Sequence, residues 1–152
     1  MIDSELATFL AEGLGIYVGT RNAALEPSGA RGVAVRVEEG GTHAVVYVAE
    51  VAAPRILPDL EANGHIAVSV GRPKDDRACQ LKGLFVAARP AGDSERDLVV
   101  AQWERFRSAL EYIGIARPIT GGWVAWPAVA LRFKVTAVFE QTPGPAAGTP
   151  IA

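Results

Sequence analysis

The residues from 131 to 140 alternate between apolar and polar side chains over most of their length. The apolar set is Leu131, Phe133, Val135, Ala137 and Phe139, and the polar set is Arg132, Lys134, Thr136 and Glu140. Successive side chains of a β-strand point to opposite faces, so this pattern predicts a strand with one face on a core and the other in water. Such half-buried strands are typical of antiparallel sheets, because parallel sheets are covered on both faces.

Other segments of the chain are also rich in strand-forming residues. In chain order they are residues 16–20, 30–37, 43–49, 65–70 and 78–89, and the strand described above is predicted to start at residue 123. Gly83, in the middle of a long strand, predicts a bend or bulge of the kind found in barrel walls. Strands and helices do not alternate as in dinucleotide-binding folds, and neither a Gly-x-Gly-x-x-Gly motif nor a Walker-type loop occurs.

Helical patterns interrupt this series of strands. The longest runs from Asp93 or Ser94 to about residue 113, and its apolar residues recur at intervals of three and four, which predicts a stripe facing the core. A short helix is expected over residues 52–63, with Pro54 in its first turn, and another short one follows Asp3. The fold class is therefore mainly β with inserted helices: about six antiparallel strands in a small closed or split β-barrel, plus one short and one long helix.

Composition limits the classes of function. A chain of 152 residues with 49% apolar and 21% charged residues is expected to fold as one globular domain. A net charge of -2 gives no support to nucleic acid as a partner, and no segment is long and apolar enough to suggest a membrane partner. The single cysteine, Cys79, and the acidic N-terminus favour a cytoplasmic location. Two histidines and one cysteine, far apart, predict no metal site.

Two arginines interrupt the apolar strand over residues 30–37. Arg31 and Arg36 each carry a fork of donors that fits a phosphate, and Gly32 allows a close approach of the backbone. We interpret this strand as the holder of a phosphorylated cofactor; the alternative is a half-exposed strand with solvated arginines. Residues five apart on a regular strand point to opposite faces. Either a bulge near Gly32 brings both arginines to one face, or one of them is a plain surface residue.

The motifs of the chain, taken in order, resemble those of the pyridoxamine 5'-phosphate oxidase-like family of FMN-binding split β-barrels. The resemblance covers most of the chain. The family's Arg-x-x-x-x-Lys phosphate segment is similar to Arg31-Gly32-Val33-Ala34-Val35-Arg36, its aromatic-Thr pair to Tyr47-Val48, and its Arg-Lys pair to Pro54-Arg55. The strand that reaches the flavin ring is similar to Cys79-Gln80-Leu81-Lys82-Gly83, and a Gly-Gly-aromatic turn is similar to Gly121-Gly122-Trp123. Arg36 replaces the lysine, and Val48 replaces the threonine, which removes one phosphate hydroxyl.

The resemblance implies a cofactor site for FMN. Its residues would be Arg31, Gly32, Val33, Arg36, Tyr47, Val48, Arg55 and Gln80, with arginines at the phosphate and Gln80 at the polar edge of the ring. At Arg55 and Gln80, solvated side chains without a ligand are the alternative. The resemblance also implies a homodimer with the flavin in a groove between subunits. Residues 1–145 would form a single split-barrel flavin-binding domain, and residues 146–152 a loose C-terminal tail.

The reaction is less constrained than the cofactor. The arginine- and histidine-bearing C-terminal segment of full pyridoxamine-phosphate oxidases has no counterpart here, so vitamin B6 oxidation is not expected. We expect a flavin-dependent oxidoreductase that acts on a small molecule or electron acceptor, with the cofactor supplying the redox chemistry. No catalytic acid or base is identified. The alternatives are a non-catalytic flavin-binding or storage protein, and a relative on the same fold that uses deazaflavin (F420) or haem.

Overall fold

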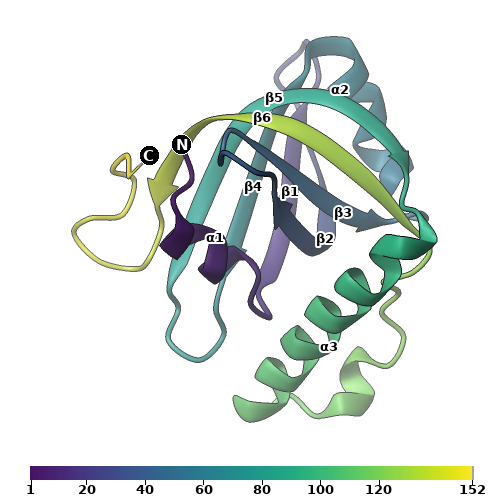
Figure 1. The fold of residues 1–152 in the computed structure, drawn as a ribbon, viewed down its shortest axis with the longest axis vertical. Helices are drawn as coiled ribbons and strands as arrows, with labels where there is room; N and C mark the ends of the chain where they lie inside the picture. The colour runs from purple at the N-terminus through teal and green to yellow at the C-terminus, as the bar shows by residue number, and fades with distance from the viewer. Residues whose placement is uncertain (152) are drawn as a thin grey trace.

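Six strands close into a barrel in the computed structural model, which describes residues 1–151 (Figure 1). The strands are β1 (Gly15–Arg21), β2 (Pro27–Val37), β3 (His43–Ala49), β4 (His65–Gly71), β5 (Ala78–Pro90) and β6 (Ala128–Glu140). Their order around the barrel is β1-β2-β3-β6-β5-β4, and every neighbouring pair is antiparallel. The predicted mainly β barrel with inserted helices is confirmed.

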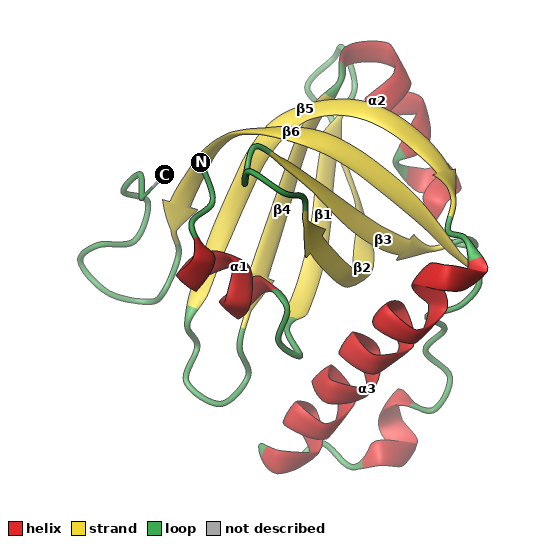
Figure 2. Cartoon of the chain, in the orientation of Figure 1, coloured by secondary structure: helices red, strands yellow, loops and turns green. Residues whose placement is uncertain are grey.

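Three α-helices accompany the barrel (Figure 2). They are α1 (Ser4–Leu10), α2 (Leu57–Asn63) and α3 (Arg96–Tyr112), with 3-10 turns η1 (Ala53–Arg55), η2 (Asp93–Glu95) and η3 (Arg117–Thr120). The short α2 and the long α3 are the two inserted helices that the sequence predicts. The Asp3 carboxylate caps α1 by accepting a hydrogen bond from the Leu6 amide at 2.8 Å.

Two predicted boundaries differ from the structure. The helix predicted over residues 52–63 is divided into η1 and α2, because Pro58 has no amide hydrogen with which to continue the first turn. The strand predicted from residue 123 begins only at Ala128. Pro127 cannot donate to a strand ladder, and residues 123–126 before it have no regular secondary structure.

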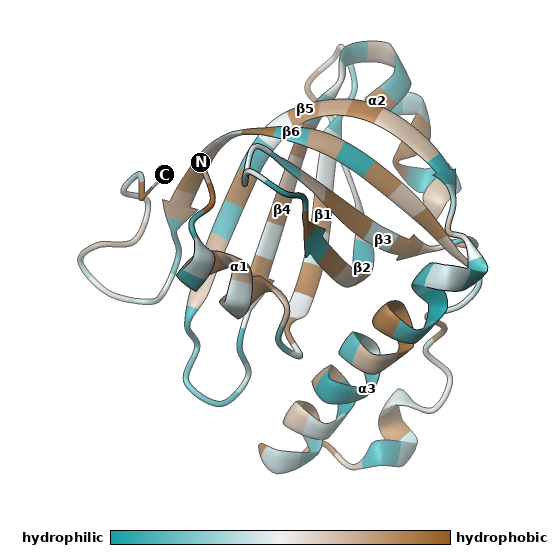
Figure 3. Ribbon diagram, in the orientation of Figure 1, coloured by the Kyte–Doolittle hydropathy of each residue, from teal (hydrophilic) through white to brown (hydrophobic). Residues whose placement is uncertain are grey.

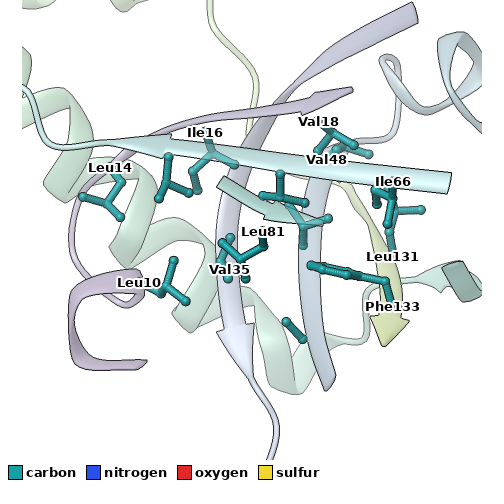
Figure 4. Packing of buried hydrophobic residues seen from close by; sticks show 14 of the residues in the cluster. Leu10, Leu14, Ile16, Val18, Val35, Val48, Ile66, Leu81, Leu131 and Phe133 are labelled. Atoms are coloured by element: carbon teal, nitrogen blue, oxygen red, sulfur yellow. The ribbon is translucent and has the colours of Figure 1, made fainter. Parts of the chain in front are cut away.

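Apolar side chains form two clusters, one on each side of the barrel wall. The first fills the barrel interior, where Ile16, Val18, Val48, Leu81 and Phe133 converge (Figure 4). The second lies outside, between α3 and the outer face of β2, β3 and β6; it comprises Val33, Ala34, Val45, Tyr47, Val99, Trp103, Phe106, Leu110, Ala125, Ala128 and Ala130. Apolar and polar bands alternate along β6 in Figure 3, as expected for a strand with a buried inner face.

A β-bulge in β2 reverses the alternation of its side chains. Gly32 pairs with Val48, but Ala34 pairs with Tyr47, so one extra residue is accommodated at Val33. Val33 and Ala34 both pack in the outer cluster, and Val35 turns back into the barrel interior. Of the two alternatives left open by the sequence, the structure has the bulge, and both flanking arginines lie on the outer face.

Helix α3 is joined to this bulge by one buried side chain. The Val35 amide donates to Gln102 Oε1 at 3.0 Å, and Gln102 Nε2 donates to the Val35 carbonyl at 2.8 Å. Gln102 is 4% exposed, so these bonds satisfy polar groups that water does not reach.

A second irregularity occurs where β5 meets β6. The register shifts between Lys82 and Gly83, which confirms the predicted irregularity at Gly83, although the extra residue, Thr136, lies on the partner strand β6. A Cβ atom on Gly83 would collide with the carbonyl oxygen of Lys134, so this close approach of two strands requires glycine.

The C-terminal residues fold back along β6. The Ile151 amide donates to the Val138 carbonyl at 2.8 Å, and Phe139 forms an isolated bridge with Pro150. The sequence predicts a loose tail from residue 146, whereas in the structure these residues make backbone hydrogen bonds to the barrel.

Candidate functional site

One line of neighbouring residues crosses four strands and reaches a fifth on the outer face of the barrel. Arg31 on β2 pairs with Tyr17 on β1, and Tyr17 pairs with Ser69 on β4. Ser69 pairs with Gln80 on β5, and Gln80 pairs with Phe139 on β6. We call these five residues the outer row. Their strand neighbours, such as Ile16 and Leu81, point into the interior, so the alternation of the strands places the outer row on the exposed side.

Aromatic rings hold the cation at one end of the outer row. The Arg31 guanidinium lies 4.2 Å from the ring centroid of Trp123 and 5.1 Å from that of Tyr17. Its Nη2 also donates to the Tyr17 hydroxyl at 3.1 Å. Within residues 1–151, no carboxylate lies within ion-pair distance of Arg31. Its remaining donors and its uncompensated charge suit an external anion such as a phosphate.

An amide and a hydroxyl form the polar part of the row on β4 and β5. Gln80 Nε2 donates to Ser69 Oγ at 2.9 Å, and both side chains are partly exposed. An amide carries donors and an acceptor, which are the groups that a heteroaromatic edge requires. Three interstrand steps separate Arg31 from Gln80, or about 14 Å along the wall. The row thus holds a cation and a polar amide at a separation suited to a ligand with a phosphate at one end and a polar ring at the other.

Arg36 belongs to a different network, at the start of α3. Its Nε donates to the Tyr47 hydroxyl at 3.3 Å, and that hydroxyl donates to Glu95 Oε1 at 2.7 Å. Arg89 forms two further bonds to Glu95, at 2.6 and 2.9 Å. These hydrogen bonds, chiefly those from Arg89, lower the pKa of Glu95 to about 2, and burial raises the pKa of Tyr47. This network joins α3 to the barrel.

The two arginines of the predicted phosphate segment therefore share a face but not a site. Gln102 binds Val35 between them, while Arg31 lies near Phe106 in the second half of α3, at 6.0 Å from that ring. Arg36 contacts Tyr47, whose hydroxyl binds Glu95 just before the helix. The bulge brings both side chains outward, and α3 separates them.

The other predicted residues lie apart from the outer row, except Gln80. Gly32 faces the barrel interior, where a Cβ atom would collide with Ile16. Val33 is buried beneath α3, and Val48 is fully buried in the barrel core. Arg55 is exposed at the end of η1. Of the eight predicted residues, the structure thus places Arg31 and Gln80 on the outer row, and Arg36 with Tyr47 in the network at the start of α3.

Sequence reasoning missed Tyr17 and Ser69, and it placed Phe139 on the core face of β6, whereas the register shift near Gly83 turns Phe139 outward. The alternation of Ile16 with Val18, and of Val68 with Val70, already places Tyr17 and Ser69 on the polar side of their strands. The sequence pattern does not reveal that β1 pairs with β4, because this pairing joins segments far apart in the chain.

Metal ligands and a reactive cysteine are two further features that a functional site can have. Within the described residues, no group of three His, Cys, Asp or Glu side chains is placed to hold a metal ion. The thiol of Cys79 is buried in the barrel, and this burial raises its pKa to about 12, far from that of a reactive cysteine. No helix among residues 1–151 has the length and apolar character needed to span a membrane.

Comparison with known proteins places the fold. No family model and no curated protein sequence matches the chain. The solved structure of HupZ from Group A Streptococcus is similar, with a TM-score of 0.57 and 15% identity, over 98% of this chain and 99% of that one. An FMN-binding protein from Syntrophomonas wolfei subsp. wolfei has a TM-score of 0.54 and 14% identity, over 97% and 85% of the two chains. An F420 reductase has a TM-score of 0.53 and 16% identity, over 86% and 93%.

At sequence identities of 14–16%, these similarities show the fold alone. The chain has the fold of the FMN-binding split barrels, as the resemblance of its motifs implies. The similarity extends over nearly the whole chain, so it includes the strands of the outer row as well as α3.

Proposed function

From the split-barrel fold and the outer row, we propose that this chain binds FMN along the row. The phosphate lies at Arg31, and the polar edge of the ring lies at Ser69 and Gln80. The observation that carries the proposal is the direct register from Arg31 through Tyr17 and Ser69 to Gln80. It links a guanidinium free of carboxylates to a partly exposed amide on one face.

The side chains present fit the proposed ligand. Arg31 supplies a charge-assisted donor for the phosphate, and Trp123 and Tyr17 limit the movement of its guanidinium. Gln80 offers both hydrogen-bond polarities to the ring. Bound FMN would supply the redox chemistry, and the role of the chain is to bind and orient it. The proposed activity is that of a flavin-dependent oxidoreductase with a small-molecule substrate or electron acceptor.

The decisive experiment is an FMN titration of matched arginine variants. Arg31→Ala removes the phosphate donor and is expected to weaken FMN binding at least tenfold, since a hydrogen bond to a charged group contributes about 1.5–3 kcal/mol. Arg36→Ala is the control, because Arg36 binds Tyr47 instead, and FMN affinity should stay within twofold of the parent. Equal effects of the two substitutions, or none at Arg31, would remove the phosphate assignment. Circular dichroism of each variant reports that the fold is retained.

Deazaflavin is the second candidate cofactor, because an F420 reductase shares the fold. Parallel titrations with FMN and F420 distinguish the two by affinity. Haem is not proposed, because the outer row contains no histidine, the commonest axial ligand of haem iron. Oxidation of reduced nicotinamide in the presence of a soluble quinone then separates an enzyme from a flavin-storage protein.

We also propose that a second copy of the chain covers the bound flavin. The row lies on an open sheet face, and Tyr17 on β1 and Val86 on β5 are 56% and 48% exposed. Large apolar side chains gathered on one face are typical of an interface. Light scattering after size exclusion, with and without FMN, tests this; a monomer under both conditions contradicts it.

A further inference from the structure

We infer that the groove next to the outer row binds an organic anion with a flat apolar body, as a second ligand beside the flavin. The groove has a volume of about 600 Å³ and lies on the outer face of β1, β4 and β5, with the edge of β6. Its lining includes Gly19, Arg21, His65, Ala67, Lys82 and Leu84. The position of this ligand beside a flavin rests on the proposed function, whereas the binding of the anion does not.

Small residues create the hollow. Gly19 on β1 pairs with Ala67 on β4, and Ala67 pairs with Lys82 on β5, so the centre of the groove has almost no side-chain volume. A Cβ atom on Gly19 would meet only the Ala67 carbonyl oxygen, at 3.9 Å. Any larger side chain at this position would occupy the space that a ligand would use.

The charges around the groove are positive. Arg21 and Lys82 line it and, among residues 1–151, neither forms an ion pair with a carboxylate. Arg21 donates only to the neighbouring Asn22 carbonyl, at 3.3 Å. The nearby acid Asp59 accepts a hydrogen bond from Thr20, whose side chain is buried on the inner side of β1. Two cations without a carboxylate partner line one hollow, and this favours an anionic ligand.

Apart from His65 and the threonines Thr20 and Thr136, the remaining lining is apolar, and this apolar part suits the other half of the ligand. Leu84 is 45% exposed and lies beside His65 in the strand register. The glycine and alanine floor offers a flat surface without hydrogen-bonding side chains. An aromatic carboxylate or phosphate matches both parts: the acid group for Arg21 and Lys82, and the ring for the floor and Leu84.

The groove begins one pleat away from the outer row. Gly19, Ala67 and Lys82 each follow or precede a row residue by two positions, or about 7 Å along the strand. The Lys82 ammonium also lies 4.8 Å from the ring centroid of Phe139, the last member of the row. A ligand in the groove would therefore lie edge to edge with a flavin ring placed over Ser69 and Gln80.

The test uses 2-naphthoate and its neutral counterpart 2-naphthamide, added to flavin-free protein and followed by ¹H–¹⁵N NMR. Naphthoate is expected to shift the amides of Gly19, Ala67 and Gly83, and to bind at least fivefold more tightly than naphthamide. Lys82→Met keeps the length of the side chain and should weaken naphthoate at least threefold. Lys74→Met, on a loop outside the groove, should leave it unchanged. Gly19→Val should abolish the shifts by filling the floor.

Each contrary result overturns the inference. The anion site is refuted if naphthamide binds as tightly as naphthoate, if the shifts are confined to other surfaces, or if naphthoate binding is unchanged in Lys82→Met. The result for Lys82→Met is decisive even if Gly19→Val fails to fold. Displacement of naphthoate by FMN would show the flavin to be the occupant, against a second ligand. Failure of FMN to bind at Arg31, with naphthoate still shifting the groove, would refute the proposed function and leave the anion site standing.

Discussion

Gln102 on α3 binds both backbone polar groups of Val35, the residue that follows the bulge in β2. The helix thereby completes hydrogen bonds at the point where the regular ladder is interrupted. The bulge in turn determines which way Arg31 and Arg36 point. A glutamine in the middle of a helix is thus a structural requirement of the candidate site, although it does not belong to the outer row.

Replacement of Gln102 by alanine leaves the Val35 amide and carbonyl without partners in a buried position. Each unsatisfied group costs about 1–3 kcal/mol, so the loss of both partners in Gln102→Ala should lower the free energy of unfolding by about 2–6 kcal/mol. Urea denaturation measures this. Gln141→Ala, at an exposed position after β6, is the control and should change stability by less than about 0.5 kcal/mol. A loss for Gln102→Ala no larger than the control's would show that Val35 finds other partners.

Glu95 should make stability depend on pH in acid. Its pKa falls to about 2 in the folded state, below the ordinary value of 4.5, so its contribution is fully present above the ordinary value and disappears as the pH falls toward 2. The stability difference between the parent protein and Glu95→Gln should therefore be largest near neutral pH and shrink between pH 5 and pH 2. Chemical denaturation at several pH values measures it. For Glu61→Gln, an exposed residue on α2, the difference should stay small throughout.

Gly83 should resist even the smallest substitution. A Cβ atom there would overlap the Lys134 carbonyl oxygen and lie 2.8 Å from Cδ2 of Phe133. Gly83→Ala forces β5 and β6 apart and should cost about 1–3 kcal/mol. In Gly122→Ala the new methyl group meets no atom within 4 Å, so thermal unfolding should show little loss. Similar melting temperatures for the two variants would contradict the close approach of the strands.

Trp123 should affect flavin affinity through Arg31. Its ring centroid is 4.2 Å from the guanidinium, and a cation–π contact at an exposed site contributes about 0.5–1 kcal/mol. Trp123→Ala should therefore weaken FMN binding about two- to fivefold, as measured by quenching of FMN fluorescence. Tyr112→Ala, at a side chain that is 81% exposed on α3, serves as the control. An unchanged affinity in Trp123→Ala would mean that Arg31 needs no support from the ring.

Local patterns in the sequence were sufficient for the elements and for most of their buried faces. In β6 the predicted core face is wrong after Val135, because a register shift places Val138 in the core and Phe139 on the outer face. Alternation along residues 131–140 predicts β6, and the spacing of Val99, Trp103 and Phe106 predicts the buried face of α3. Gly83 indicates the register shift between β5 and β6, because a glycine inside a strand is by itself a sign of such an irregularity. At Pro127 the predicted start of β6, residue 123, was wrong, because the strand begins at Ala128; near Pro58 the predicted helix is divided into η1 and α2.

The sequence by itself determined a barrel of alternating strands, an arginine-bearing segment and a polar residue at position 80. Only the tertiary structure decided that Arg31 and Gln80 share one row, that the bulge at Val33 turns Arg36 outward, and that α3 keeps the two arginines apart. The physical reason is that periodicity tells which face a side chain occupies, whereas the neighbours on that face depend on register between strands distant in the chain.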